Sequence, residues 1–240
     1  MPRHFSRRAV LQTAGASGLA AAIGLSSAPR HGFASANTQP WAILSNAQAR
    51  WLAAAADVFI PEDDFPSASQ AGVVDYIDLQ MAGEYGQGAG LYLQGPFFEG
   101  TPQQGWQFDM TPADLLLRGI DRLNAEDTPL FDLGATDRAD FVQRLSERTQ
   151  PIGGDTSATE FFSLLHSLVN EGYFADPMYL GNYDYAGWRM VGFPGAHAYY
   201  LDRVDEDSIT PAPPPMGVAH HPNGRPRAPR VIPNGGQADG

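Results

Sequence analysis

The chain has 240 residues, 43% of them hydrophobic, with 27 acidic residues, 15 arginines, no lysine and no cysteine, and its formal net charge is −12. The missing cysteine excludes disulfides, thiolate zinc sites, all-cysteine iron–sulfur clusters and thioether-attached haem, while the missing lysine excludes Schiff-base chemistry and a Walker A loop. The negative charge argues against a general nucleic-acid binder, and the length and composition predict one domain with a sizeable core.

The first 36 residues are typical of a twin-arginine (Tat) signal peptide. Arg7 and Arg8 stand directly before an uncharged, mildly apolar segment, and Ala34 and Ala36 supply the small residues that signal peptidase accepts. A basic disordered tail or an uncleaved anchor is the alternative, but the many glycines and serines disfavour an anchor. We therefore predict that 1–36 directs a folded protein through the Tat translocase to the periplasm.

Two helices are predicted at the start of the mature domain. Ser45 and Gln48 form a capping box before apolar residues at helical spacing, and Pro61 ends that helix. A second apolar stripe over 73–81 predicts another helix, which ends near Gly83.

An irregular insertion and two further helices follow. Residues 84–110 hold six glycines, two prolines and six aromatic residues, a composition that does not suit a short connector. Thr111 and Pro112 provide a cap and a first-turn proline for the next helix. Thr136 and Asp137 mark the entry to the helix after that.

The last predicted helix begins at a capping box made by Ser157 and Glu160, and Gly172 can close it. A second insertion rich in glycine and aromatic residues occupies 172–200. The sequence shows neither a series of strands nor a G-x-G-x-x-G motif. We therefore predict a mostly α fold, a compact helical domain at 37–207 with two long irregular loops.

Residues 208–240 form a separate tail with eight prolines between Pro211 and Pro233, which predicts disordered or extended chain. The tail contains one His220-His221 pair, which is weak support for a metal site. Without the signal and the tail, the body keeps 8 arginines against 26 acidic residues, a net charge of −18. Such a surface favours solubility, and it could also attract a basic partner.

The second insertion is the strongest candidate for an interaction surface. Aromatic side chains on irregular backbone give much contact area for little lost entropy, although they can also fold back and pack on the helices. The candidates, for contact or for shaping the loop that makes contact, are Tyr173, Tyr179, Asn182, Tyr183, Trp188 and Phe193.

Candidate chemistry is sparse, and we predict no catalytic, cofactor-binding or metal-binding residue in this chain. His166 sits on an apolar helix, where a structural role is the usual one, and His197 lies in the loop. The acidic run 62–64 could bind a cation, but successive residues cannot all point at one centre. The carboxylates flanking the second insertion could bind calcium, but they show no regular ligand spacing; they are Glu171, Asp176 and Asp184.

The chain from about residue 45 to 200, together with its leader, resembles the gluconate 2-dehydrogenase subunit 3 family. The most specific resemblance is a G-x-x-x-D-P-x-Y-x-G-N block followed by G-W and G-x-P. Leu180 stands directly before Gly181-Asn182, where the resemblance leads us to expect a glycine, and this leaves open a divergent branch and hence a different sugar. The segments that carry the resemblance are Phe59-Ile60-Pro61, 72–78, 170–177, Gly181-Asn182, Gly187-Trp188 and 192–194.

The resemblance implies a small (gamma) subunit without a cofactor of its own. It implies a partner large subunit that carries FAD and oxidises a sugar or sugar acid, and a multihaem cytochrome c subunit that passes electrons to quinone. The small subunit would stabilise and co-export the leaderless large subunit, and would meet the inner membrane only through its partners.

Two alternatives stay open. One is a freestanding periplasmic binding or structural protein, because an aromatic loop can also bind a ligand. The other is a catalytic subunit that uses carboxylates of the 172–184 loop with His166 or His197.

Overall fold

The structure is a computed structural model, and it describes residues 41–98, 101, 104–126, 128–196, 205, 214–218 and 232. Several predictions fall outside these residues, and the structure does not bear on them: the Tat signal at 1–36 with Arg7, Arg8, Ala34 and Ala36, and the histidines His197, His220 and His221.

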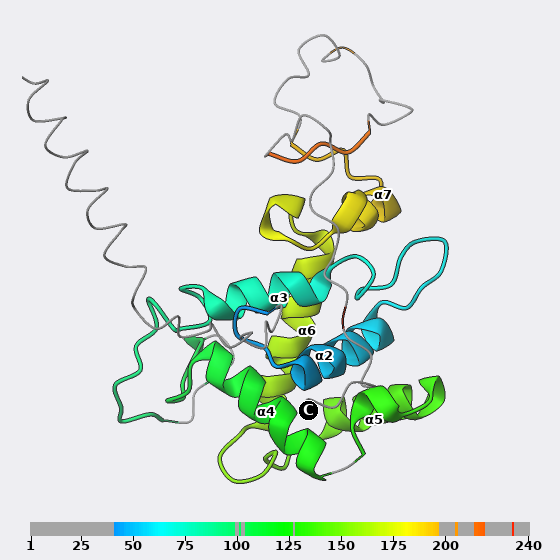
Figure 1. The fold of residues 1–240 in the computed structure, drawn as a ribbon. Helices are drawn as coiled ribbons and strands as arrows, with labels where there is room; N and C mark the ends of the chain where they lie inside the picture. The colour runs from blue at the N-terminus through cyan, green and yellow to red at the C-terminus, as the bar shows by residue number, and fades with distance from the viewer. Residues whose placement is uncertain are drawn as a thin grey trace, which may run out of the picture. The chain divides into compact units, whose positions relative to one another are not determined.

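The described chain is mostly helical, as predicted, and contains no named strand within these ranges (Figure 1). Its named elements are α-helices and short 3-10 turns, and one isolated β-bridge joins Gly195 to Met216. In chain order they are α2 (Asn46–Phe59), α3 (Val73–Ala82), α4 (Pro112–Glu126), η3 (Leu130–Asp132), α5 (Ala135–Glu147), α6 (Ala158–Phe174), η4 (Pro177–Tyr179), η5 (Tyr183–Tyr185) and α7 (Ala186–Val191).

The predicted helix starts at α2 and α4 are confirmed by their caps. At α2 the Gln48 backbone N–H donates to Ser45 Oγ at 3.2 Å, and the Ser45 N–H donates to Gln48 Oε1 at 2.8 Å. At α4 the Asp114 N–H donates to Thr111 Oγ1 at 3.1 Å. These side chains satisfy backbone donors that a helix N-terminus otherwise leaves without partners.

Two other helix ends differ from the prediction. α5 begins at Ala135 after Gly134, which offers no side-chain cap, so Thr136 already lies in the first turn. α6 begins as expected after Ser157, but it continues past Gly172. Gly172 lies inside the helix, where a Cβ would approach Tyr76 Cδ1 of α3 to 3.0 Å. Close helix packing, and not a chain reversal, favours a glycine here.

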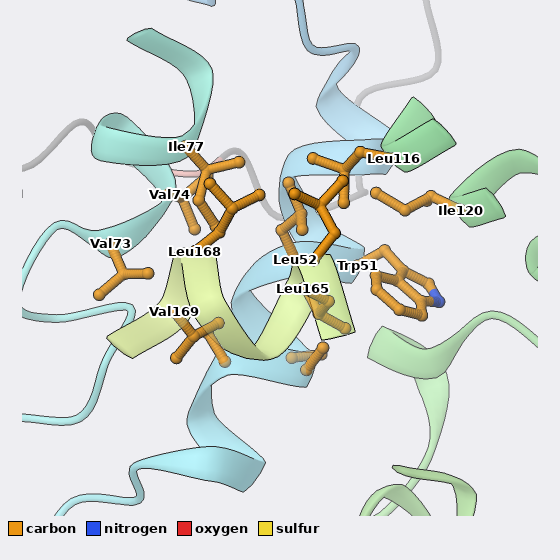
Figure 2. Packing of buried hydrophobic residues seen from close by; sticks show 14 of the residues in the cluster. Trp51, Leu52, Val73, Val74, Ile77, Leu116, Ile120, Leu165, Leu168 and Val169 are labelled. Carbon is orange, nitrogen blue, oxygen red and sulfur yellow. The ribbon is translucent and has the colours of Figure 1, made fainter. Parts of the chain in front are cut away.

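The hydrophobic core lies between α6 and the helices α2, α3 and α4 (Figures 1 and 2). In Figure 2 the labelled side chains of the four helices form one cluster, with Leu168 of α6 between Ile77 of α3 and Leu52 of α2. Trp51 joins α5 to this core, since its ring meets Phe141 edge-on at 6.4 Å and Phe161 at 5.9 Å. All these side chains are buried, and apolar burial of this kind is the main stabilising contribution to a domain.

The first described residues are tied to α3 by a buried carboxylate. Asp78 accepts the backbone N–H groups of Ala42, Ile43 and Leu44 at 2.7, 3.0 and 3.2 Å. A buried carboxylate needs such donors, because its desolvation is otherwise unfavourable. Residues 42–44 are therefore held against α3.

The two insertions differ in regularity. The described part of 84–110 carries no α-helix, as predicted, and Trp106 holds its end by donating from Nε1 to the Met110 carbonyl at 2.7 Å. The insertion at 172–200 is more regular than expected, since it contains the end of α6, two 3-10 turns and α7.

Candidate functional site

Beyond the end of α6, the chain forms a small unit that we call the C-terminal lobe, defined as residues 175–196 with the segment 214–218. In Figure 1 it contains η4, η5 and α7, next to the orange segment near residue 216. The lobe holds most of the predicted interface residues, so its construction decides which of them can reach a partner.

Asn182 is at the centre of the lobe. Its side chain is fully buried, its Nδ2 donates to the Ala175 carbonyl at 2.8 Å, and its Oδ1 accepts from the Gly187 N–H at 2.8 Å. Its backbone is left-handed, with φ of 48°, a conformation that asparagine tolerates better than most residues. Asn182 therefore connects the end of α6 to the start of α7 and shapes the loop.

Glycines allow the lobe to approach α6 at backbone contact. A Cβ on Gly181 would lie 2.2 Å from the Gly172 carbonyl oxygen, and a Cβ on Gly187 would lie 2.2 Å from the Tyr173 carbonyl oxygen. No side chain fits at such distances, so these positions require glycine.

Two of the predicted aromatic residues also hold the backbone of the lobe in place, and together with Asn182 and the two glycines they form what we call the frame of the lobe. Tyr173 is fully buried and donates from its hydroxyl to the Pro66 carbonyl at 2.7 Å. Trp188 is buried, donates from Nε1 to the Phe174 carbonyl at 2.7 Å, and stacks on Tyr185 with ring centroids 5.4 Å apart. Buried aromatic side chains with a satisfied polar group fix the backbone around them.

The remaining candidates are accessible. Tyr179 is 48% exposed and Phe193 is 47% exposed, while Tyr183 is half-buried. Phe193 meets the Trp188 ring edge-on at 5.1 Å, so its orientation is fixed although half of its surface faces solvent. The six predicted residues thus divide into three that shape the lobe and three that can contact a partner.

Sequence reasoning missed the aliphatic part of the surface. Of the ten large hydrophobic residues that are exposed in the described chain, six belong to the lobe. We call them the lobe's exposed apolar residues: Met178, Tyr179, Met190, Val191, Phe193 and Val218. The methionine and valine residues between the aromatic residues could have indicated this apolar surface, but whether a side chain is exposed depends on the fold and not on residue type.

The segment 214–218, which the sequence placed in the tail, is part of this surface. Met216 pairs with Gly195 in a parallel β-bridge, and its carbonyl accepts from the Ala196 N–H at 2.7 Å. Asp176 caps η4 by accepting from the Met178 N–H at 2.9 Å, and it also accepts from the Val218 N–H at 2.6 Å. Segment 214–218 is extended, which is one of the two forms predicted for the tail, and it packs against residues 175–196 of the lobe.

A tyrosine–glutamate contact lies beside the lobe. The Tyr76 hydroxyl donates to Glu171 Oε2 at 3.0 Å. Burial first, and then the charge of Glu171, raise the pKa of Tyr76 well above its usual range. Burial and Glu171 also raise the pKa of Tyr85. Both phenols therefore stay neutral at physiological pH, and Tyr76 stays a hydrogen-bond donor.

The other candidate groups occupy structural positions. His166 is exposed on α6, with its ring against Phe59 and Phe162 at 5.5 and 6.3 Å. Asp184 pairs with Arg189 at 3.1 Å. In the acidic run, Asp63 accepts from the Phe65 N–H at 2.8 Å and thereby forms a turn.

No three histidine, aspartate or glutamate side chains in the part of the chain that the structure describes are arranged to hold a metal ion. None of the described helices has the length and apolarity needed to cross a membrane.

Comparison with known proteins gives one family. The model of gluconate 2-dehydrogenase subunit 3 matches residues 46–195, which is more than half of the chain and includes most of the lobe. The chain therefore belongs to this family. No curated protein and no solved structure matches it.

Proposed function

We propose that this member of the gluconate 2-dehydrogenase subunit 3 family is a non-catalytic small subunit that binds and escorts a flavoprotein large subunit. The family name itself implies a complex of several subunits. The observation that carries the docking role is the lobe, whose exposed apolar residues project from a frame with its own hydrogen bonds.

A fixed frame matters for affinity. Binding orders side chains and loops, and each flexible side chain that is immobilised lowers the net affinity. Tyr179 is the last residue of the η4 turn that Asp176 caps, and Phe193 rests on Trp188. Both therefore present apolar area in a conformation that already exists before the partner arrives.

The negative charge of the body predicts a second property of the partner, namely the charge of its contact surface. The body has 26 acidic residues and 8 arginines, and most of the arginines that the structure describes are engaged in local ion pairs. The partner's face should carry excess arginine or lysine around an apolar centre, because complementary charge accelerates association and selects the orientation. Higher salt should accordingly slow complex formation.

The division of labour follows from the resemblance. The large subunit carries FAD, which supplies the oxidation of a sugar or sugar acid, and the cytochrome subunit carries haem c. This chain would hold the large subunit through its lobe, and its Tat signal with Arg7 and Arg8 would take the folded complex to the periplasm. Glu171, Asp176 and Asp184 each have a local partner, and no specific observation favours catalysis by them.

Docking is tested by co-purification with the large subunit. The variants Val191→Asp and Phe193→Asp place a charge in the apolar centre, and each should reduce the retained large subunit about tenfold or more. Phe98→Asp is the matched control, because Phe98 is also exposed but lies in the other insertion. Equal retention by all three variants would show that the lobe is not the docking site.

Escort is tested separately by Arg7→Lys with Arg8→Lys. Large-subunit activity should then remain in the cytoplasmic fraction. If the large subunit still reaches the periplasm with this variant, the escort role is wrong even where docking holds.

A further inference from the structure

One described arginine of this acidic protein differs from the others in its contacts. Among the described residues seven arginines occur, and six of them have an ion pair or donate to backbone carbonyls: Arg50, Arg118, Arg122, Arg138, Arg148 and Arg189. Arg144 has neither within the part of the chain that the structure describes, although acidic residues outnumber arginines by more than three to one in the body.

Arg144 lines a pocket between α4 and α5. The pocket has a volume of about 210 Å³, and its apolar wall consists of Leu123, Phe141 and Leu145, which are all buried. The polar side of the pocket is formed by Glu126, Arg144 and Arg148.

The other two charges of the pocket neutralise each other. Arg148 Nη1 donates to Glu126 Oε2 at 2.8 Å, and this contact lowers the pKa of Glu126, which therefore stays ionised. Arg148 also donates to the Pro151 carbonyl at 2.7 Å, so its guanidinium is committed to the following loop. The uncompensated charge of the pocket is therefore the single positive charge of Arg144.

A structural role explains only part of the environment of Arg144. It lies in the last turn of α5, where a positive charge interacts favourably with the helix dipole. Any position in that turn would serve this purpose equally. The dipole explains neither the adjoining pocket nor the absence of an acidic partner among the described residues, although Asp140 lies four residues earlier on the same helix.

Size and chemistry together indicate a ligand class. An apolar cavity of about 150 Å³ accommodates benzene, so this pocket has room for a ring or a short aliphatic chain with a carboxylate attached. Guanidinium groups bind carboxylates through paired N–H donors.

We propose that this pocket binds a monoanionic carboxylate with a small apolar body. The carboxylate would accept from Arg144, and the apolar body would lie against Leu123, Phe141 and Leu145. A polyhydroxylated sugar acid matches the charge but not this wall, because its hydroxyls would lose water without gaining partners there. This site is separate from the lobe, and it does not rest on the proposed function.

The proposal is tested by titrating the full-length chain with sodium benzoate at constant low ionic strength, followed by amide NMR. Benzoate should bind saturably with a Kd on the order of 1 mM or tighter, with shifts concentrated around residues 123, 141 and 145. Benzyl alcohol lacks the charge, acetate lacks the apolar body, and gluconate has a polar body. All three should bind at least about tenfold more weakly than benzoate.

Variants separate the ligand site from a helix-end effect. Arg144→Gln should weaken benzoate binding about tenfold or more, while Arg118→Gln, which removes an exposed arginine from α4, should leave it unchanged. The thermal midpoint of each variant reports the structural contribution independently.

The proposal is overturned if benzoate does not bind saturably, or if Arg144→Gln binds it as well as the parent chain. It is equally overturned if benzyl alcohol, acetate or gluconate binds as tightly as benzoate, because the site would then not select both charge and apolar body.

Discussion

The helical core and the C-terminal lobe are stabilised in opposite ways. The core is held by buried apolar side chains, with Trp51 and Leu165 among those at its centre. The lobe is held by hydrogen bonds from Asn182 and Trp188 to backbone groups and by glycines at backbone contact, while it exposes Met190 and Val191.

The difference separates stability from recognition. In the core an apolar side chain contributes stability through burial, so its removal leaves a cavity. In the lobe the polar frame supplies the shape, and the exposed apolar side chains are free to contribute to binding. Substitutions in the two regions should therefore affect different measurements.

The largest expected effect is in the core. Trp51→Ala should lower the free energy of unfolding by about 3–5 kcal/mol, because it removes a buried ring packed against Phe141 and Phe161. Urea denaturation followed by circular dichroism measures this. Val191→Ala in the lobe is the control, and it should change stability by no more than about 0.5 kcal/mol. Similar losses from the two variants would contradict the contrast between the regions.

The second effect is in the frame of the lobe. Asn182→Ala should cost about 2–3 kcal/mol, because the Ala175 carbonyl and the Gly187 N–H lose their buried partner. Hydrogen exchange should accelerate first at lobe amides, including Gly187, while the α2 amides keep their protection. Asn170→Ala removes a solvent-accessible asparagine contact and is the matched control. Uniform acceleration in both regions would show that the lobe does not open separately.

A smaller effect concerns backbone strain. Leu180 has φ of 72°, and left-handed backbone is unfavourable for a side chain with a Cβ. Leu180→Gly should therefore be more stable than Leu180→Ala by about 1 kcal/mol, although both lose the leucine side chain. The thermal midpoints of the two variants measure this. If Leu180→Ala is the more stable of the two, the position is not strained.

The smallest effect is a pH dependence at the junction of the two regions. Tyr76 has a raised pKa in the folded state, so its contribution to stability is complete below the unfolded value of about 10 and is lost as the pH rises above it. Tyr76→Phe should reduce the loss of stability measured by denaturation between about pH 9 and 11. The variant should still lose some stability over this pH range, because the pKa values of Tyr85 and Tyr173 are also raised. Superimposable pH curves for the two proteins would contradict this assignment.

Local sequence signals located most of the helices. The Ser45–Gln48 capping box marks the start of α2, and Thr111 with Pro112 marks the start of α4, because caps act within one turn of chain. The entry to α5 was displaced by one or two residues, since Gly134 precedes that helix without a side-chain signal. Gly172 was misinterpreted as a helix end because, in a sequence, a glycine favoured by close helix packing looks the same as one favoured by a chain reversal.

The sequence by itself also determined the family and the acidic character of the body, whereas the separation of signal, helical domain and tail stays a prediction. Composition and short motifs carry these properties, and none of them needs a long-range contact. The match of the family model over 46–195 agrees with the resemblance that the aromatic and glycine motifs indicate.

Only the tertiary structure decided which side chains of the lobe shape it and which face outward. Tyr173 is buried because its hydroxyl reaches the Pro66 carbonyl 107 residues earlier, whereas Tyr179, with the same side chain, remains half exposed. The same holds for Arg144, whose pocket exists only where α4 and α5 meet. Burial and pairing depend on contacts between distant segments, and residue type alone does not specify those contacts.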